Sequence, residues 1–261
     1  MSNRPLTAPC ASKLPRDFAA GWNSLTFPAE NGVELLYQLY IPQNFDMAKR
    51  YPLILYMHSA GVRCDDNSHI YTGEAKFLRN LEANAYRDGV LVLAPCCPRP
   101  EKWVGVDRWN GLEFDADTLP QTRYMAAAIE LFADVCANLP VDLARRSLYG
   151  MSMGGFAVWD ILARYPHTFA AAIVAAGCGS PKQAAEMTDV ALWIFHGTAD
   201  NAVPFRSAEI MRDALTAAGH PSLKFTAFEG AGHGIWVPTA DTEGLYDWLF
   251  SKKREESEAD A

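Results

Sequence analysis

Gly150-Met151-Ser152-Met153-Gly154 is a G-x-S-x-G pattern that lies where a short strand is expected to turn into a helix. Residues 147–149 before it are strand-like, and residues 155–163 after it have the composition of a helix. Side chains at Gly150 and Gly154 would collide with neighbouring backbone in so tight a turn, and glycine tolerates its strained dihedral angles. A serine held on such a turn projects from the sheet, where its oxygen can attack an ester or amide carbonyl.

A serine nucleophile needs a base to take its proton, and the base needs a carboxylate to orient it. On this kind of strand–turn–helix scaffold the order along the chain is Ser, then Asp or Glu, then His. His233, in a glycine-flanked loop, is the candidate base for Ser152, and Asp200, in the loop after a buried apolar strand, is the candidate acid. Asp189 lies at the wrong end of that strand, and Asp213 lies on the solvated face of an expected helix.

The other histidines fit the role of base less well. His58 and His196 end apolar strands and are interpreted as structural groups near the site, whereas His69, His167 and His220 lie in loops or polar connections. The sequence has neither an H-E-x-x-H nor a C-x-x-C motif, so zinc-dependent hydrolysis is not expected. We therefore expect a site without a metal and without a cofactor.

Several separated stretches match a known family pattern, and they extend over nearly the whole chain: residues 51–58, 60–61, 65–67, 93–95, 152–155, 196–200 and 232–236. On these motifs the chain resembles the α/β-hydrolase superfamily. More narrowly, it resembles bacterial esterases related to the feruloyl esterase, polyhydroxybutyrate depolymerase and prolyl-oligopeptidase groups. The resemblance implies a doubly wound α/β fold and a serine hydrolase.

In α/β-hydrolases the oxyanion hole takes one backbone amide from the loop after a central strand and one from the residue after the nucleophile. These positions predict the amides of Ala60 and Met153, each donor being worth about 3–4 kcal/mol of barrier. The family usually has His-Gly-Ala-Gly at this loop, and an acid where Val62 stands, whereas this chain has Ser59 at the second position. We include Ser59 among the expected substrate-binding residues.

Strands and helices alternate along the sequence, which predicts a doubly wound, mostly parallel sheet of eight strands. The first two strands flank Asn31-Gly32, a strong hairpin signal. The expected strands are residues 24–29, 34–41, 52–58, 90–95, 145–149, 171–176, 191–196 and 223–229. The expected helices are residues 71–87, 121–138, 153–164, 205–218 and 239–250.

The sequence indicates one α/β-hydrolase domain over residues 23–251, with an N-terminal extension (1–22) and a charged flexible tail (252–261). The connection 98–119 is long for such a fold, and long loops at strand ends are usually functional or mobile. It carries Trp103 and Trp109, which we expect to line the substrate pocket together with Trp236. The chain has no room for a large cap domain, so we expect an open site.

The chain has 261 residues, 49% of them hydrophobic, and a formal net charge of −8, which argues against nucleic acid or an anionic membrane as a partner. The N-terminus has no apolar run of signal-peptide length, so a cytoplasmic protein is expected, or a secreted one if a leader has been removed. Six scattered cysteines suit free thiols, with a disulfide from Cys64 to Cys96 or Cys97 as the alternative. Oligomeric state is left open.

These observations predict a serine esterase that acts on a small-molecule ester, either a short acyl ester or an ester of an aromatic acid. Three alternatives remain. A peptidase of the prolyl-oligopeptidase type would normally carry a gating domain, and a dienelactone-type hydrolase would normally have cysteine where Ser152 stands. A binding module that kept the fold without catalysis is the third.

Overall fold

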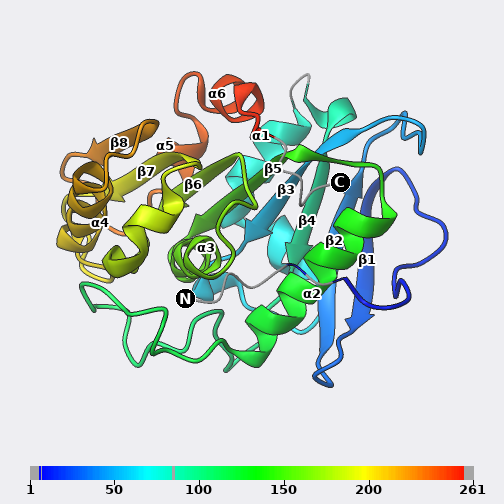
Figure 1. Ribbon diagram of the computed structural model, residues 1–261, viewed down its shortest axis with the longest axis horizontal. Coiled ribbons are helices and arrows are strands. Elements are labelled where there is room, and N and C mark those ends of the chain that lie inside the picture. The colour runs from blue at the N-terminus through cyan, green and yellow to red at the C-terminus, as the bar shows by residue number, and fades with distance from the viewer. Residues whose placement is uncertain (1–5, 7, 84–85, 256–261) are drawn as a thin grey trace.

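The structure is a computed structural model that describes residues 6, 8–83 and 86–255. Eight strands form one sheet in the order β1-β2-β4-β3-β5-β6-β7-β8, as Figure 1 shows. The strands are β1 (Gly21–Pro28), β2 (Glu34–Ile41), β3 (Tyr51–Met57), β4 (Leu91–Pro95), β5 (Val141–Met151), β6 (Ala171–Ala175), β7 (Ala191–Gly197) and β8 (Leu223–Phe228). β2 pairs antiparallel with β1 and with β4, and the pairs from β4 through β8 are parallel. The mostly parallel eight-stranded sheet is thus confirmed.

Helices cover both faces of the sheet (Figure 1). One face packs against α2 (Arg123–Asn138), α3 (Met153–Arg164) and α4 (Phe205–Ala217). The opposite face packs against α1 (Lys76–Glu82), α5 (Trp236–Ala240) and α6 (Leu245–Ser251). The sheet therefore needs apolar side chains on both sides of every central strand.

β3 shows how the sequence meets this need. Leu53 and Leu55 belong to the core cluster under α2 and α3, whereas Ile54 and Tyr56 belong to the cluster on the opposite face. All four side chains are at most 3% exposed. Because successive residues of a strand point to opposite faces, a continuous apolar run fills both clusters at once.

The turn from β5 into α3 is so close to its neighbours that it requires glycine. A Cβ atom at Gly150 would lie 2.1 Å from the carbonyl oxygen of Gly154, and a Cβ at Gly154 would lie 1.9 Å from the carbonyl oxygen of Met57. The predicted collision is therefore confirmed. Ser152 itself has φ 55° and ψ −119°, a strained conformation for a residue with a side chain.

Two expected helices differ from the structure. The expected helix 71–87 is reduced to α1, because Thr72 is extended (φ −81°, ψ 166°) and separates the short 3₁₀ helices Ser68–Tyr71 and Gly73–Ala75. Residues 84 and 85 of that expected helix lie outside the described part of the chain. The expected helix 239–250 is divided into α5 and α6 by Gly244, whose φ of 71° is left-handed.

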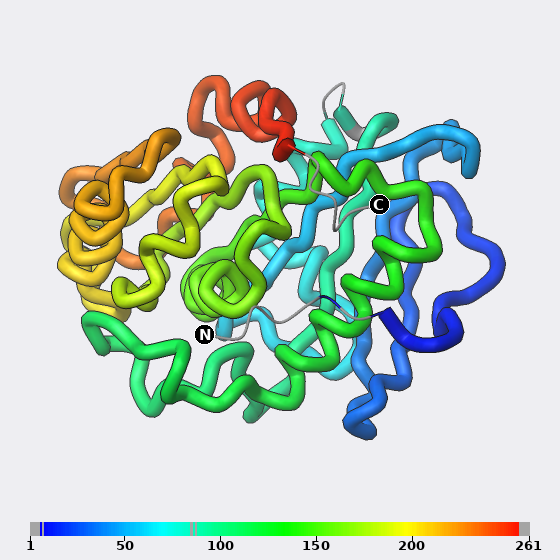
Figure 2. The backbone as a smooth tube through the Cα atoms, viewed as in Figure 1, coloured from blue at the N-terminus to red at the C-terminus, as the bar shows by residue number. Residues whose placement is uncertain are grey.

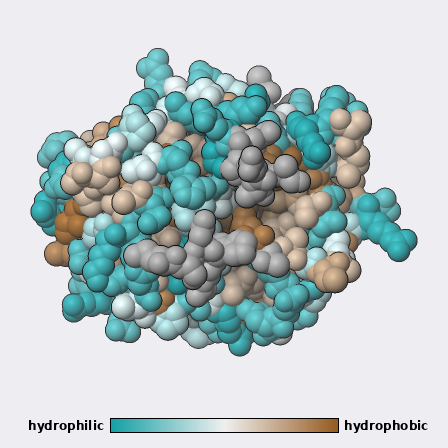
Figure 3. All heavy atoms as spheres, in the orientation of Figure 1, coloured by the Kyte–Doolittle hydropathy of each residue, from teal (hydrophilic) through white to brown (hydrophobic). Residues whose placement is uncertain are grey.

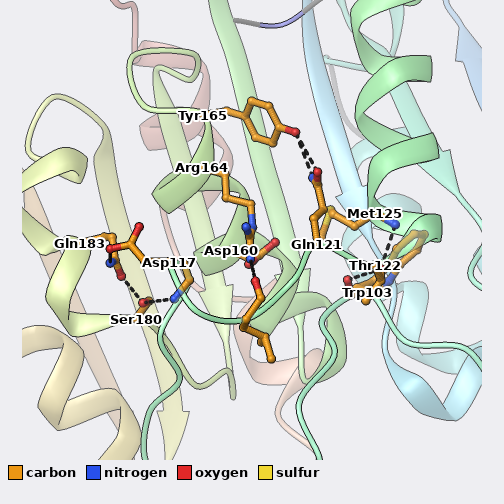
Figure 4. Close-up of polar contacts among 12 residues, drawn as sticks. Trp103, Asp117, Gln121, Thr122, Met125, Asp160, Arg164, Tyr165, Ser180 and Gln183 are labelled. Atoms are coloured by element: carbon orange, nitrogen blue, oxygen red, sulfur yellow. Dashed lines mark hydrogen bonds and ion pairs between the residues drawn. The ribbon is translucent and has the colours of Figure 1, made fainter. Parts of the chain in front are cut away.

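The connection from β4 to α2 runs along the lower edge of the molecule in Figure 2, below α3. Polar contacts to the body of the protein hold it, as Figure 4 shows. The Arg164 guanidinium of α3 donates to the carbonyl oxygen of Leu119 at 2.6 Å, and the Gln183 amide donates to the Asp117 carboxylate at 2.9 Å. The long loop is therefore fastened at its C-terminal half, next to the helix that follows Ser152.

The two terminal segments are partly anchored. The Lys13 ammonium pairs with Glu130 of α2 at 2.6 Å, and the Lys13 amide donates to Asp134 at 2.8 Å. Arg254 is 8% exposed and its amide donates to the Ala144 carbonyl oxygen at 2.8 Å. The expected tail from residue 252 onward thus begins with residues packed on the domain, and residues 256–261 lie outside the described part.

Hydrophilic residues cover much of the face of the molecule drawn in Figure 3. Within the described residues, no helix has both the length and the apolar character needed to cross a membrane.

Replacing Gly154 by alanine tests the close approach of α3 to β3. The added Cβ has backbone rather than a flexible side chain in its way, so we expect Gly154→Ala to lower the free energy of unfolding by about 3 kcal/mol or more. Urea unfolding followed by tryptophan fluorescence measures it. Gly73→Ala is the control, since a Cβ there meets nothing within 4 Å. Equal stability of the two variants would contradict this account of the turn.

Candidate active site

Ser152 lies between the end of β5 and the first turn of α3. Its amide donates to the Ala175 carbonyl oxygen of β6 at 2.9 Å, and its own carbonyl oxygen accepts from the Phe156 amide at 3.0 Å. Both bonds hold the strained backbone in place from two sides. The side chain is thereby presented at the carboxyl end of the central strands, where the loops after β3, β7 and β8 also gather.

The structure brings His233 and Asp200 to Ser152. His233 Nε2 lies 2.8 Å from Ser152 Oγ, and His233 Nδ1 lies 2.7 Å from Asp200 Oδ2. Because an ionised carboxylate only accepts, Nδ1 carries the ring proton and Nε2 is left to accept from the serine hydroxyl. The His233 side chain is 29% exposed and that of Asp200 is fully buried. The three predicted residues therefore form one continuous hydrogen-bonded chain.

Asp200 is held in its ionised form by several donors. Burial raises the pKa of this carboxyl, but hydrogen bonds from His196, His233 and the Val203 amide outweigh burial and hold the pKa well below its usual range. Oδ1 accepts from the amides of Ala202 at 2.8 Å and Val203 at 2.9 Å. His196 Nε2 lies 2.9 Å from the Val203 carbonyl oxygen and 3.3 Å from Asp200 Oδ2. As predicted, His196 is a structural group beside the site.

The two amides expected to form the oxyanion hole both begin a helix. Met153 is the first residue of α3, and Ala60 is the first residue of the 3₁₀ helix Ala60–Val62. The first amides of a helix have no acceptor within it, so they are available to an anion. Ala60 lines the same cavity as Ser152. The joint role of the two amides as an oxyanion hole stays a prediction.

Buried polar contacts support the loop that carries Ser59 and Ala60. His58 Nδ1 donates to the Ser59 carbonyl oxygen at 2.8 Å, and Nε2 accepts from the Cys97 amide at 2.9 Å. The indole nitrogen of Trp103 donates to the His58 carbonyl oxygen at 3.2 Å. Burial, with a contribution from His69, lowers the pKa of His58 to about 3, so this ring is neutral.

A cavity of about 250 Å³ opens beside Ser152. Of the expected substrate-binding residues, Ser59, Trp109 and Trp236 line it. Trp103 does not: it is 0% exposed, and its ring packs against His58 with centroids 5.3 Å apart. The expectation for Trp103 is corrected, because its indole supports the loop from behind instead of facing the cavity.

Glu74 lines the same cavity and was not predicted. It lies in the 3₁₀ helix Gly73–Ala75, and its carboxylate accepts a hydrogen bond from the Ser59 hydroxyl. A Cβ at Gly61 would lie 2.8 Å from Glu74 Oε1, so the glycine allows the carboxylate to approach the loop. In the sequence Glu74 falls inside an expected helix, where an acidic residue is usually solvated. The one signal in the sequence is its proximity along the chain to the loop that carries Ser59 and Ala60.

The strand order, the helices on both faces and the turn at Ser152 define the class of protein as an α/β-hydrolase fold. A model of the dienelactone hydrolase family matches residues 120–261, more than half of the chain, and the chain belongs to this family. The family assignment holds although serine, and not cysteine, stands at position 152.

Solved structures agree with this assignment. A thermostable esterase is 27% identical with a TM-score of 0.80, and the match covers 89% of this chain and 63% of that one. The chain thus spans less than two thirds of the length of that esterase. A ferulic acid esterase is 18% identical with a TM-score of 0.64, covering 89% and 97% of the two chains. Esterase 2 of Thermogutta terrifontis is 21% identical with a TM-score of 0.54, covering 88% and 91%.

The buried neutral His58 should make stability depend on pH. The pKa of His58 is lowered to about 3 in the folded protein, so below its unfolded pKa of about 6.5 the unfolded chain binds more protons than the folded one. The free energy of unfolding therefore decreases as the pH is lowered from about 6.5. We expect His58→Gln to reduce the slope of unfolding free energy against pH between about 6.5 and 4 by up to about 1.4 kcal/mol per unit. Urea titrations at several pH values measure it. His167→Gln, at an exposed histidine, is the control. Equal slopes of unfolding free energy against pH for wild type and His58→Gln would contradict the account of His58 as a buried, neutral histidine.

Proposed function

We propose that this chain is a serine hydrolase that cleaves carboxylic esters through a triad of Ser152, His233 and Asp200. The observation that supports it is the unbroken chain of hydrogen bonds, 2.8 Å from Ser152 Oγ to His233 Nε2 and 2.7 Å from His233 Nδ1 to Asp200 Oδ2. The family membership and the esterases among the structural neighbours support the same class of reaction.

In the first half of the proposed reaction, Ser152 Oγ attacks the ester carbonyl while His233 Nε2 takes the hydroxyl proton. The carbonyl oxygen gains negative charge and accepts hydrogen bonds from the amides of Ala60 and Met153. Asp200 stabilises the imidazolium, and its own donors keep it ionised throughout. His233 then protonates the departing alkoxide oxygen, which leaves an acyl group on Ser152.

In the second half, a water molecule replaces the alcohol. His233 Nε2 takes a proton from the water, whose oxygen attacks the acyl carbon, and the same amides stabilise the second oxyanion. When the tetrahedral intermediate collapses, His233 returns the proton to Ser152 Oγ and the carboxylic acid leaves. This chemistry needs no redox change and no cofactor.

The cavity favours small substrates. Drug-sized ligands usually occupy pockets of about 300–1,000 Å³, so a cavity of about 250 Å³ suits a short acyl group or one aromatic ring. Trp109 and Trp236 supply flat apolar walls on which an aromatic acid can stack. We therefore propose short acyl esters and aromatic-acid esters as substrates.

The Glu74 carboxylate adds a charge preference to this proposal. Of the Asp, Glu, Lys and Arg side chains in the described part, Glu74 is the one that lines the cavity, and it already accepts from Ser59. A carboxylate with free lone pairs attracts a hydroxyl or ammonium group on the substrate and repels a substrate carboxylate. We propose that neutral or cationic esters are preferred over anionic ones.

Replacing Ser152 by alanine should lower kcat for p-nitrophenyl acetate by about 10³-fold or more, because no acyl-enzyme can form. Asp200→Asn should lower kcat by a similar factor, since the amide favours the wrong histidine tautomer. Initial rates at neutral pH measure both effects. Ser251→Ala and Asp189→Asn are matched controls away from the site and should keep wild-type activity.

Covalent labelling separates the nucleophile from other causes of inactivity. Esterase 2 of Thermogutta terrifontis has been described phosphorylated by paraoxon. We expect paraoxon to add one diethyl phosphate to wild type and none to Ser152→Ala, as measured by intact-protein mass and peptide mapping. Turnover by Ser152→Ala within several-fold of wild type, or labelling at another residue, would refute the proposed nucleophile.

Exchanging Glu74 for glutamine tests the charge preference. The amide oxygen can still accept from Ser59, so the change removes the charge and keeps the shape. We expect the ratio of kcat/KM for an anionic ester, such as a succinate monoester, to that for the neutral ester to rise about tenfold. The exposed Glu243→Gln is the control and should leave the ratio unchanged. An unchanged ratio in Glu74→Gln would show that the carboxylate does not meet the substrate.

A further inference from the structure

A cluster of two thiols and one imidazole lies behind the loop that carries Ser59 and Ala60. Cys64 and His69 belong to the segment between β3 and α1, and Cys96 follows β4 directly. Cys64 Sγ lies 3.2 Å from Cys96 Sγ and 3.8 Å from His69 Nδ1, and all three atoms lie within 4.8 Å of one another. His69 and Cys96 are at most 1% exposed, whereas Cys64 is partly exposed.

The His69 ring directs its unprotonated nitrogen, Nδ1, toward the Cys64 thiol. Its Nε2 lies 3.1 Å from the Ala94 carbonyl oxygen, which only accepts, so Nε2 carries the proton and Nδ1 carries the lone pair. A histidine whose second nitrogen donates to a backbone carbonyl is the usual arrangement of a metal ligand, because that bond fixes tautomer and ring direction.

We propose that Cys64, His69 and Cys96 bind one Zn²⁺ ion. Two soft thiolates and a neutral imidazole are donors that zinc prefers. In a tetrahedral site with Zn–S bonds of about 2.3 Å and a Zn–N bond of about 2.0 Å, the two sulfur atoms lie about 3.8 Å apart. Each sulfur then lies about 3.5 Å from the nitrogen. The sulfur atoms must separate by about 0.6 Å to bind zinc. To form a disulfide of about 2.05 Å they must approach by about 1.1 Å.

The binding reaction balances without a redox step. Both thiols lose their protons to solvent as two Zn–S bonds form, and His69 Nδ1 donates its lone pair without losing a proton. Cys64 is partly exposed, so we expect water to complete the coordination as the fourth ligand.

The cluster has a structural connection to the proposed oxyanion loop. The His69 ring packs against His58 with centroids 5.1 Å apart, and His58 in turn donates to the Ser59 carbonyl oxygen. Bound zinc would link the segment after β3 to the end of β4 and would support the loop that carries Ser59 and Ala60 from its buried side. The ion takes no part in the ester chemistry, so the site can be tested whether or not the chain is an esterase.

Cobalt substitution gives a direct readout. Wild-type protein, fully reduced and freed of metal with a chelator, is titrated with Co²⁺ and then with Zn²⁺. We expect one equivalent of Co²⁺ to produce the near-ultraviolet thiolate-to-cobalt absorption, Zn²⁺ to displace it at micromolar concentration or below, and Zn²⁺ to raise Tm. Cys64→Ser and Cys96→Ser should abolish the thiolate band, and His69→Gln should weaken binding at least tenfold. Cys10→Ser, at an exposed cysteine, should behave as wild type.

Two results would overturn the proposal. One is a folded, fully reduced wild-type protein that takes up no Co²⁺ and no Zn²⁺. The other is purified protein whose mass is lower by two hydrogens, with Cys64 and Cys96 joined in peptide maps, because the cluster is then a disulfide. If the buried Cys96→Ser variant fails to fold, the partly exposed Cys64→Ser variant and the wild-type titration still decide the matter.

Discussion

The close approach of α3 to the end of β3 is the constraint on which the site depends. Gly154 brings the first turn of α3 against the carbonyl oxygen of Met57, at a distance that leaves no room for a side chain. That contact places the Met153 amide beside the segment that continues from β3 through Ala60. The turn at Ser152 and the proposed oxyanion loop are thus positioned by one steric contact, and neither could shift without the other.

The parallel sheet brings together the loops that carry Ser152, Asp200 and His233. β5, β7 and β8 run in the same direction, so the loops that follow them meet at one edge. Ser152, Asp200 and His233 each follow one of these strands, which is why residues 33 and 81 positions apart along the chain reach hydrogen-bonding distance. Hydrogen-bond donors around the buried Asp200 side chain keep its carboxylate ionised, so it can orient the His233 ring.

Buried groups around the candidate site support its position. Trp103 and His58 hold the backbone of the loop before Ala60, and His196 and the Val203 amide hold Asp200. Each of these groups is buried, and the Nδ1 of His58, the indole nitrogen of Trp103, the Nε2 of His196 and the Val203 amide each bond to a backbone or carboxylate oxygen. Such contacts fix the positions of reacting groups through rigid neighbours, and they explain why a tryptophan near the site need not touch a substrate.

The sequence by itself determined the sheet, the identity and order of Ser152, Asp200 and His233, and the need for glycine at positions 150 and 154. Those features are local: they follow from apolar runs, from a turn motif and from the order of residues along the chain. Tertiary structure alone decided that Trp109 lines the cavity while Trp103 is buried, that Glu74 faces the cavity, and that Cys64, His69 and Cys96 meet. These outcomes depend on how the segment after β3 packs against the end of β4 and the loop 98–119. Contacts among these three separate segments depend on the order of the strands in the sheet and on the direction of each side chain, and no local sequence pattern encodes either.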